Sequence, residues 1–251
     1  MISSGNGMTR DGICCLIFDL DGTLYRQAPV RRGMLLRLLL HCGRHPKDGL
    51  RTISFIRHFQ RAQEELRHSG ASADQLKLAC RRARVATSWG LNCIEHWFNE
   101  RPLDLIAQSI YPELPKFLER ARTAGFTLAV VSDYPAERKL RALGILDFFS
   151  SVVSSSDSRV GCFKPSPNGI RIALEELRVP ASRALYIGDR PEVDAEAAKR
   201  ADMSCVIIGS HPRDPHASWR GERDYRSLAQ WLGVSLEGFS PLAQRTNIKV
   251  G

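Results

Sequence analysis

The sequence predicts an α/β protein with a doubly wound parallel sheet and an inserted all-helical domain. Short apolar runs without charges alternate with amphipathic stretches from Pro115 to Ile208, as in strands joined by crossover helices. Between residues 26 and 104 the pattern changes, because apolar residues recur at helical spacing and no strand-like run interrupts them. The chain of 251 residues is long enough to bury such a core without disulfides.

The first apolar run ends in two carboxylates. Ile13 to Phe18 is predicted to be a strand buried on both faces, and Asp19 and Asp21 follow it directly. Because residues two apart on a strand point the same way, both side chains are expected to leave the strand end together. Ligands of parallel sheets bind beyond the carboxyl ends of the strands. On these residues alone, however, an ordinary turn with a solvated Asp19 is the simpler interpretation.

The segment from Arg26 to Arg101 is predicted to be helical and is strongly basic. It holds fifteen Lys and Arg against six Asp and Glu, which accounts for the whole net charge of +9. Ser72 to Gln75 has the form of a capping box that starts a helix running to about Val85. Asn92 to Glu100 predicts a further short helix, which Pro102 stops.

After residue 111, helices and strands are predicted to alternate. The predicted strands span residues 126–131, 152–153, 184–187 and 205–208, and the predicted helices span 115–125, 135–143, 167–178, 192–201 and 225–232. Such alternation is expected to give right-handed crossovers and a parallel sheet with helices on both faces. The predicted core therefore comprises residues 1–25 and 105–251, with little signal in 211–251, and the helical insert comprises residues 26–104.

Polar residues follow each of the main strands. Ser132 and Asp133 follow the second strand, and Asp189 and Asp194 follow the strand that ends before Gly188, where the lack of a side chain permits close approach of the backbone. Together with the two acids after the first strand, these carboxylates would repel one another unless a cation sits among them. Ligation by oxygen atoms alone suits Mg²⁺.

Three further residues near these strand ends each have two interpretations. Lys164 stands before a predicted helix, where it could supply positive charge to the acids, although a lone lysine is more often solvated. Asp133 precedes the start of another predicted helix, which favours a capping role over a contact with substrate. Arg190 follows Asp189 directly, and a surface salt bridge is at least as expected there as a contact with phosphate.

The chain resembles a hydrolase of the haloacid dehalogenase superfamily, in the phosphatase branch. Four motifs of that superfamily occur in order: Asp19 to Thr23 (Asp-Leu-Asp-Gly-Thr), Ser132, Lys164-Pro165, and Gly188 to Asp194. The resemblance covers about residues 12–209 apart from the insert. The place of the insert, between the first and second motifs, resembles that of a C1-type helical cap on a Rossmann-like core.

This resemblance implies a role for each motif residue. Asp19 would be the nucleophile that forms an aspartyl-phosphate, and Asp21 would be the general acid and base. Ser132 and Lys164 would bind the phosphate. The groups implied to hold Mg²⁺ are Asp19, the backbone carbonyl of Asp21, Asp189 and, in support through water, Asp194. The implied function is Mg²⁺-dependent hydrolysis of a small phosphomonoester.

Other functions remain open on the sequence alone. A phosphomutase, or another phosphoryl- or phosphonate-transfer enzyme of this superfamily, would use the same core, although no histidine or lysine of the insert stands in a motif that identifies one. A basic segment could also mark a nucleic-acid-binding protein, but aromatic stacking patterns and a recognition motif are missing, so we do not expect nucleic acid as a partner. A basic insert facing the site favours an anionic metabolite, such as a nucleotide or sugar phosphate.

The composition also indicates a cellular setting. The seven cysteines are odd in number and have no paired Cys-x-x-Cys spacing, which is typical of a reduced, intracellular protein. No apolar stretch is long enough to span a bilayer, and residues 1–10 lack the apolar region of a signal peptide. We therefore expect a soluble, cytoplasmic protein with no membrane partner. Nothing in the sequence indicates the oligomeric state.

Overall fold

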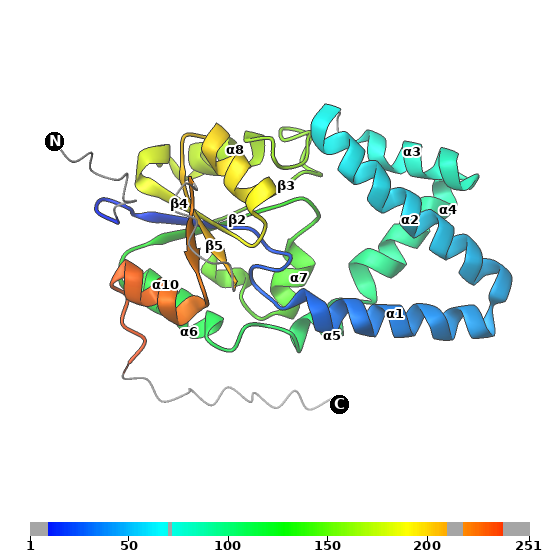
Figure 1. Ribbon diagram of the computed structural model, residues 1–251, viewed down its shortest axis with the longest axis horizontal. Coiled ribbons are helices and arrows are strands. Elements are labelled where there is room, and N and C mark those ends of the chain that lie inside the picture. The colour runs from blue at the N-terminus through cyan, green and yellow to red at the C-terminus, as the bar shows by residue number, and fades with distance from the viewer. Residues whose placement is uncertain (1–9, 70–71, 210–217, 238–251) are drawn as a thin grey trace, which may run out of the picture.

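The computed structural model describes residues 10–69, 72–209 and 218–237. A parallel sheet flanked by helices forms one part of the molecule, and helices of the insert form a separate group beside it (Figure 1). This arrangement confirms the predicted doubly wound α/β fold with its helical insert. The parts of the predicted tail at 211–217 and 238–251 lie outside the described residues.

Six parallel strands form the sheet in the order β3-β2-β1-β4-β5-β6. Their bounds are Cys15–Phe18 (β1), Thr127–Ser132 (β2), Ser151–Ser154 (β3), Ala184–Gly188 (β4), Ser204–Ile208 (β5) and Arg220–Glu222 (β6). The chain adds β2 and β3 on one side of β1 and the later strands on the other, so the topological switch point lies at β1. Phe18 pairs with Val130 of β2 and Ile187 of β4, and the loops after these three strands therefore meet at one edge.

The two faces of the sheet bury separate hydrophobic layers. On β1, Leu16 and Phe18 point into one layer, while Cys15 and Ile17 point into the other, as strand alternation requires. The helices that pack on the first face are α6 (Leu114–Thr123), α7 (Glu137–Ala142) and α10 (Tyr225–Leu232), and those on the second are α8 (Asn168–Leu177) and α9 (Glu196–Arg200). Figure 1 shows α8 on the opposite side of the sheet from α6 and α10.

The insert has a hydrophobic cluster of its own. Its elements are α1 (Gln27–Arg44), α2 (Pro46–Ser69), α3 (Asp74–Ala83), α4 (Thr87–Ile94) and the π-helix η1 (Glu95–Glu100), followed by the short helix α5 (Leu103–Ala107). Phe55 and Phe59 of α2 pack there with Cys80, Cys93 and Trp97. An apolar stripe on α2 thus packs within the insert rather than against the sheet. The domain bounds at residues 26 and 104 stay a prediction.

The predicted capping box at Ser72 is wrong. Helix α3 begins at Asp74, and no side chain caps it. The Ser72 hydroxyl instead donates to the carbonyl oxygen of Ser155 in the core, at 2.7 Å. The Gln75 amide nitrogen donates to the carbonyl oxygen of Phe59, at 2.9 Å. The side chains of Ser72 and Gln75, which the local pattern assigns to the helix end, therefore form hydrogen bonds with distant parts of the chain instead.

Two other elements differ from the sequence prediction. The helix predicted over 192–201 begins as the π-helix η4 (Pro191–Ala195), which continues into α9. Strand β6 was not predicted, because its three residues include an arginine and a glutamate and carry no alternating apolar pattern. It pairs with β5 at the edge of the sheet, where such a short polar strand is tolerated.

Within the described part of the chain, no helix combines the length and apolar character needed to cross a membrane. All seven cysteines fall in that part, and each is a free thiol. Cys15, Cys80, Cys93 and Cys205 are buried, where a thiol packs as a small apolar group.

Candidate active site

Asp19 lies at the carboxyl end of β1 and is 6% exposed. Its backbone N–H donates to the carbonyl oxygen of Ile187 at 2.8 Å, which extends the pairing with β4 beyond the strand end. Its carboxylate accepts hydrogen bonds from the Thr23 hydroxyl, at 3.0 Å, and from the Lys164 ammonium. The interpretation of Asp19 as a solvated turn residue is therefore wrong, because the carboxylate is buried and paired.

Lys164 is a buried ammonium that bridges two carboxylates. Its Nζ contacts Asp19 and lies 2.7 Å from Oδ1 of Asp194, so it is not the solvated lysine of the alternative interpretation. Burial opposes the charged form, but the two carboxylates outweigh it and raise the pKa of Lys164 well above its usual value. Oδ2 of Asp194 accepts the backbone N–H groups of Asp189, at 3.2 Å, and Arg190, at 3.0 Å. Asp194 thus fixes both Lys164 and the loop after β4.

Two glycines make room for the acids. A Cβ at Gly188 would lie 2.5 Å from the Cβ of Asp194, which confirms the close approach expected there. Gly22 has a φ of +108°, and a Cβ at this position would overlap the carboxylate of Asp189. Because L-residues rarely adopt this φ, Gly22 is required for both its conformation and its space.

Asp19, Asp189 and Asp194 form a cluster that suits a divalent cation. Their nearest carboxylate oxygens lie within 4.8 Å of one another. Burial and then repulsion from Asp194 raise the pKa of Asp189 to about 6. Burial also raises the pKa of Asp19, although Lys164 opposes the shift. One ammonium does not balance three carboxylates, and the all-oxygen donor set therefore fits Mg²⁺.

Asp21 follows the same strand but has different partners. Both of its carboxylate oxygens lie 2.7 Å from Nζ of Lys139, and the Tyr25 hydroxyl donates to one of them. Burial alone would raise the pKa of Asp21, but Lys139 and Tyr25 bring it below its usual value. The backbone carbonyl oxygen of Asp21 accepts a hydrogen bond from Nε2 of Gln27, at 2.7 Å. Asp21 is therefore held as a carboxylate, the form that accepts a proton.

Ser132 and Asp133 stand where β2 ends. The buried Ser132 hydroxyl oxygen accepts the backbone N–H of Tyr134 at 3.2 Å. The predicted capping role of Asp133 is wrong, since α7 begins further along without a side-chain cap. The Asp133 carboxylate instead lies 2.6 Å from Nη1 of Arg67 on α2 and accepts the backbone N–H of Lys164 at 3.0 Å. This contact joins the insert to the loop that carries Lys164.

Arg190 forms surface salt bridges. Its guanidinium lies 2.9 Å from Glu192 and 3.9 Å from Glu64 on α2. The salt bridge expected of Arg190 is therefore present, and Arg190 also lines the cavity that contains Asp19 and Lys164.

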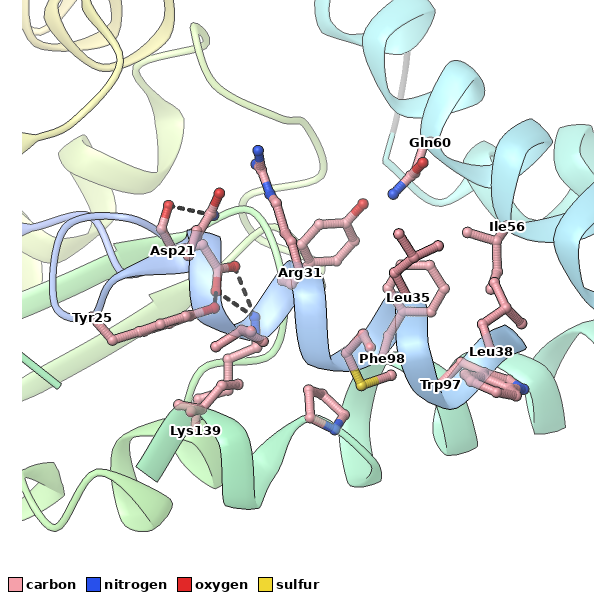
Figure 2. Close-up of a pocket in the computed structure, with 16 residues that line it drawn as sticks. Asp21, Tyr25, Arg31, Leu35, Leu38, Ile56, Gln60, Trp97, Phe98 and Lys139 are labelled. Atoms are coloured by element: carbon pink, nitrogen blue, oxygen red, sulfur yellow. Dashed lines mark hydrogen bonds and ion pairs between the residues drawn. The ribbon is translucent and has the colours of Figure 1, made fainter. Parts of the chain in front are cut away.

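Two adjoining cavities lie between the insert and the strand ends. The first, of about 270 Å³, is lined by Asp19, Lys164 and Asp189 among others. The second, of about 380 Å³, extends from Asp21 along α1 and is shown in Figure 2. Asp21 and Arg31 line both cavities, so they mark the place where the two adjoin. Side chains from the core and the insert thus contribute to one continuous site.

A sequence model of haloacid dehalogenase-like hydrolases matches residues 13–202, a stretch that includes all four motifs and the insert. The chain belongs to this family. The family and the hydrolase class predicted from the motifs are therefore confirmed.

Among relatives of this hydrolase, the phosphoglycolate phosphatase of Rhodospirillum rubrum is 29% identical over 233 residues, which cover 89% of this chain and 92% of the relative. The phosphoserine phosphatase of Thermus thermophilus is 28% identical over 231 residues, which cover 81% of this chain and 92% of the relative. A solved structure of a HAD phosphatase from Thermococcus onnurineus superposes with a TM-score of 0.64 at 23% identity, covering 88% of this chain and 99% of that one. These relatives agree with the phosphatase branch predicted from the motifs.

Several site residues of this hydrolase have no motif in the sequence. Lys139 pairs with Asp21 from α7, and Arg67 reaches the site from α2. Gln27 and Tyr134 also line the first cavity. The sequence gives one weak indication for Lys139. It lies on the helix that follows β2, and such a helix lies close to the site at the end of that strand. For the site residues of the insert the sequence gives no such indication, because their contacts depend on how the insert packs against the core.

Most of the positively charged side chains of the insert do not line this hydrolase's site. Of the fifteen Lys and Arg between Arg26 and Arg101, all within described stretches, Arg31 and Arg67 line the two cavities. Arg67 is already paired with Asp133. Elsewhere, Arg51 lies over the ring of Trp89. The expected basic surface over the site is thus reduced to two guanidiniums.

Proposed function

We propose that this hydrolase cleaves small phosphomonoesters in a Mg²⁺-dependent reaction that passes through an aspartyl-phosphate. The observation that carries the proposal is the buried Asp19 carboxylate at the sheet edge, which Lys164 contacts and beside which Asp21 faces both cavities. The phosphatase relatives support the same reaction class. They do not favour a phosphomutase, phosphonate transfer or nucleic-acid binding. The cytoplasmic location stays a prediction.

In the first half-reaction, Asp19 would attack the phosphorus of the substrate. A bond forms between a carboxylate oxygen and phosphorus while the bond to the leaving oxygen breaks. Asp21, a carboxylate in the free protein, would first take up a proton from the phosphate monoanion of the substrate or from water and would then give it to that oxygen. In the second half-reaction, Asp21 would take a proton from the water that attacks the same phosphorus. This step releases phosphate and restores the Asp19 carboxylate. The ion pair with Lys139 favours the carboxylate form of Asp21, which the second half-reaction requires.

The other motif residues would stabilise the transferred phosphoryl group. Lys164 is placed to share its positive charge between Asp19 and that group, and Ser132 would add a hydroxyl from the end of β2. Mg²⁺ would be held by Asp19, Asp189 and the backbone carbonyl of Asp21, with Asp194 in support. When bound, the cation would neutralise charge on the phosphoryl oxygens.

The proposal is tested by phosphate release from p-nitrophenyl phosphate with Mg²⁺. Asp19→Asn keeps the shape of the side chain but removes the attacking charge, so the rate should fall by orders of magnitude, and EDTA should have the same effect on the wild type. The exposed Asp11, just before β1, provides the matched control, because Asp11→Asn is the same chemical change outside the site. Full activity of Asp19→Asn, or of the wild type in EDTA, would overturn the proposal.

A further inference from the structure

The second cavity is apolar over most of its length. Figure 2 shows Asp21, Tyr25 and Lys139 at one end, while Leu38, Ile56 and Trp97 surround the other. Three of its lining residues carry charge, namely Asp21, Lys139 and Arg31. The first two form an ion pair with each other. Within the described parts of the chain, Arg31 is therefore the charged lining residue without an ion pair, and it lies where the two cavities adjoin.

None of the described residues that line the far end of the cavity carries charge, and the nearby Arg101 lies over the ring of Trp97. A carboxylate or ammonium group placed beside Leu38 and Trp97 would lose part of its water without gaining an ion pair from the lining, which is unfavourable. A hydrocarbon group placed there would gain by leaving water. The lining thus distinguishes between substrates by the polarity of the group attached to the phosphate.

The wall of this cavity is built by an unusual helix. Trp97 and Phe98 are consecutive residues of the π-helix η1, and both line the cavity. π-helical turns are rare and occur frequently at functional sites. Met34 and Leu38 of α1 pack in the same hydrophobic cluster as Trp97, yet they leave the space between them unfilled. The resulting space is an apolar pocket beside the site, and such pockets bind the apolar parts of ligands.

The size of the cavity limits the group that it can hold. A cavity of about 150 Å³ lined by apolar side chains binds benzene, and this one measures about 380 Å³. It therefore has room for a group larger than one aromatic ring. Leu35 lines the cavity and is 58% exposed, so the space is open to solvent beside α1.

We propose that the substrate is the phosphate monoester of an apolar alcohol or phenol, whose hydrocarbon group fills this cavity while its phosphate lies at Asp19. The inference rests on the proposed function and adds the class of substrate. Asp21 stands where the cavities adjoin, so it lies beside the oxygen that links the phosphate to the hydrocarbon. This differs from the nucleotide or sugar phosphate expected from the basic charge of the insert.

The test compares kcat/KM for ethyl, butyl and hexyl phosphate with that for phosphoglycolate and phosphoserine. The alkyl leaving groups have nearly equal acidity, so the series changes apolar area and little else. Each added methylene should raise kcat/KM about fourfold, so hexyl phosphate, with four more methylenes, should exceed ethyl phosphate by about two-hundredfold. A flat series, or phosphoglycolate as a better substrate than hexyl phosphate, would overturn the inference.

Variants of α1 locate the effect. Leu38→Gln places a polar group in the cavity and should lower kcat/KM for hexyl phosphate by about tenfold, with little change for ethyl phosphate. Leu36→Gln is the matched control, because Leu36 is 58% exposed, lies on the same helix and does not line the cavity. Equal effects of the two substitutions would contradict the assignment.

Inhibition of p-nitrophenyl phosphate hydrolysis by alkylphosphonates, and their direct binding by calorimetry, give readouts that depend neither on turnover of the alkyl esters nor on a variant. Hexylphosphonate should inhibit the wild type about two-hundredfold more strongly than ethylphosphonate. Asp19-dependent hydrolysis without a chain-length effect would contradict the proposed class of substrate but not the proposed function. Loss of hydrolysis from every ester tested, with phosphonate binding retained, would instead sink the proposed function.

Discussion

Arg67→Met should destabilise the protein strongly, because it removes a buried guanidinium that joins the insert to the core. Nη1 of Arg67 lies 2.6 Å from the Asp133 carboxylate and 2.6 Å from the carbonyl oxygen of Lys164. The side chains of Arg67 and Asp133 are 5% and 12% exposed. Met retains an unbranched apolar side chain but has no donor. The variant therefore leaves the Asp133 charge buried without its ionic partner.

The size of the effect follows from that burial. Removal of one partner of a buried ion pair costs about 3–5 kcal/mol. Asp133 keeps its hydrogen bond from the Lys164 N–H, so the lower figure applies, and the free energy of unfolding should fall by about 3 kcal/mol. For a chain of this length, each kcal/mol lowers Tm by about 2–4 °C. The expected decrease in Tm is therefore about 6–12 °C.

Thermal unfolding of Arg67→Met beside Arg82→Met tests this reasoning. Arg82 forms a two-pronged pair with Glu65, at 2.8 and 2.9 Å, but the two side chains are 35% and 51% exposed. Because exposed pairs contribute little, Arg82→Met should leave Tm near that of the wild type. In a double-mutant cycle, Arg67→Met combined with Asp133→Asn should cost less than the sum of the two single changes. Equal shifts for the two arginine variants, or strict additivity in the cycle, would refute the argument.

The remaining predictions concern the carboxylates of the site. Asp21→Asn should slow hydrolysis of alkyl phosphates by about 10²–10⁴-fold. It should slow the first-turnover release of p-nitrophenol much less, because that leaving group needs no proton. Equal losses in the burst assay with the aryl ester and the steady-state assay with the alkyl esters would make Asp21 a structural residue. Gly188→Ala should displace Asp194 and lower both activity and Tm, whereas Gly43→Ala, where an added Cβ meets no atom within 4 Å, should change neither adversely; a Gly188→Ala variant that behaves like the control contradicts the packing argument. The pKa of Asp189 is raised from 3.8 to about 6, so the folded protein without metal binds the extra proton and loses stability as the pH rises through that range. Mg²⁺ competes with that proton, so it should raise Tm more at about pH 8 than at about pH 5, and equal increases in thermal scans at the two pH values would oppose this view.

The fold and the centre of the site could be predicted because both depend on local patterns. Charge-free runs of strand length mark buried parallel strands, and the run from Ile13 to Phe18 contains β1. Because parallel strands end at one edge, acids that follow separate strands, such as Asp19 and Asp189, were expected to meet there, and they do. Gly188 was likewise expected to permit a close approach, and the position of Asp194 against it confirms this.

The long-range contacts of the site, within the core and between insert and core, could not be predicted in the same way. Lys139 and Arg67 carry no spacing that names their partners, and each pairs with a residue more than 60 positions away. The local sequence predicted that Asp133 caps a helix, but its carboxylate forms an ion pair with the distant Arg67. The apolar cavity had no signal, because the pattern of α1 shows which residues are apolar and not which of them face an empty space.

The central claim is that Asp19 is the nucleophile, and the most direct measurement is the location of a phosphoryl group on the chain during turnover. In Asp21→Asn the second half-reaction lacks its base, so a phosphorylated enzyme should accumulate with p-nitrophenyl phosphate and Mg²⁺. Acid quenching, borohydride reduction of the acyl phosphate and mass spectrometry of the peptide from residues 11–26 would identify the modified side chain. We predict the label at Asp19, and its absence when Asp19→Asn is combined with Asp21→Asn. A label on another residue, or turnover by Asp21→Asn with no labelled peptide at any quench time, would contradict the account.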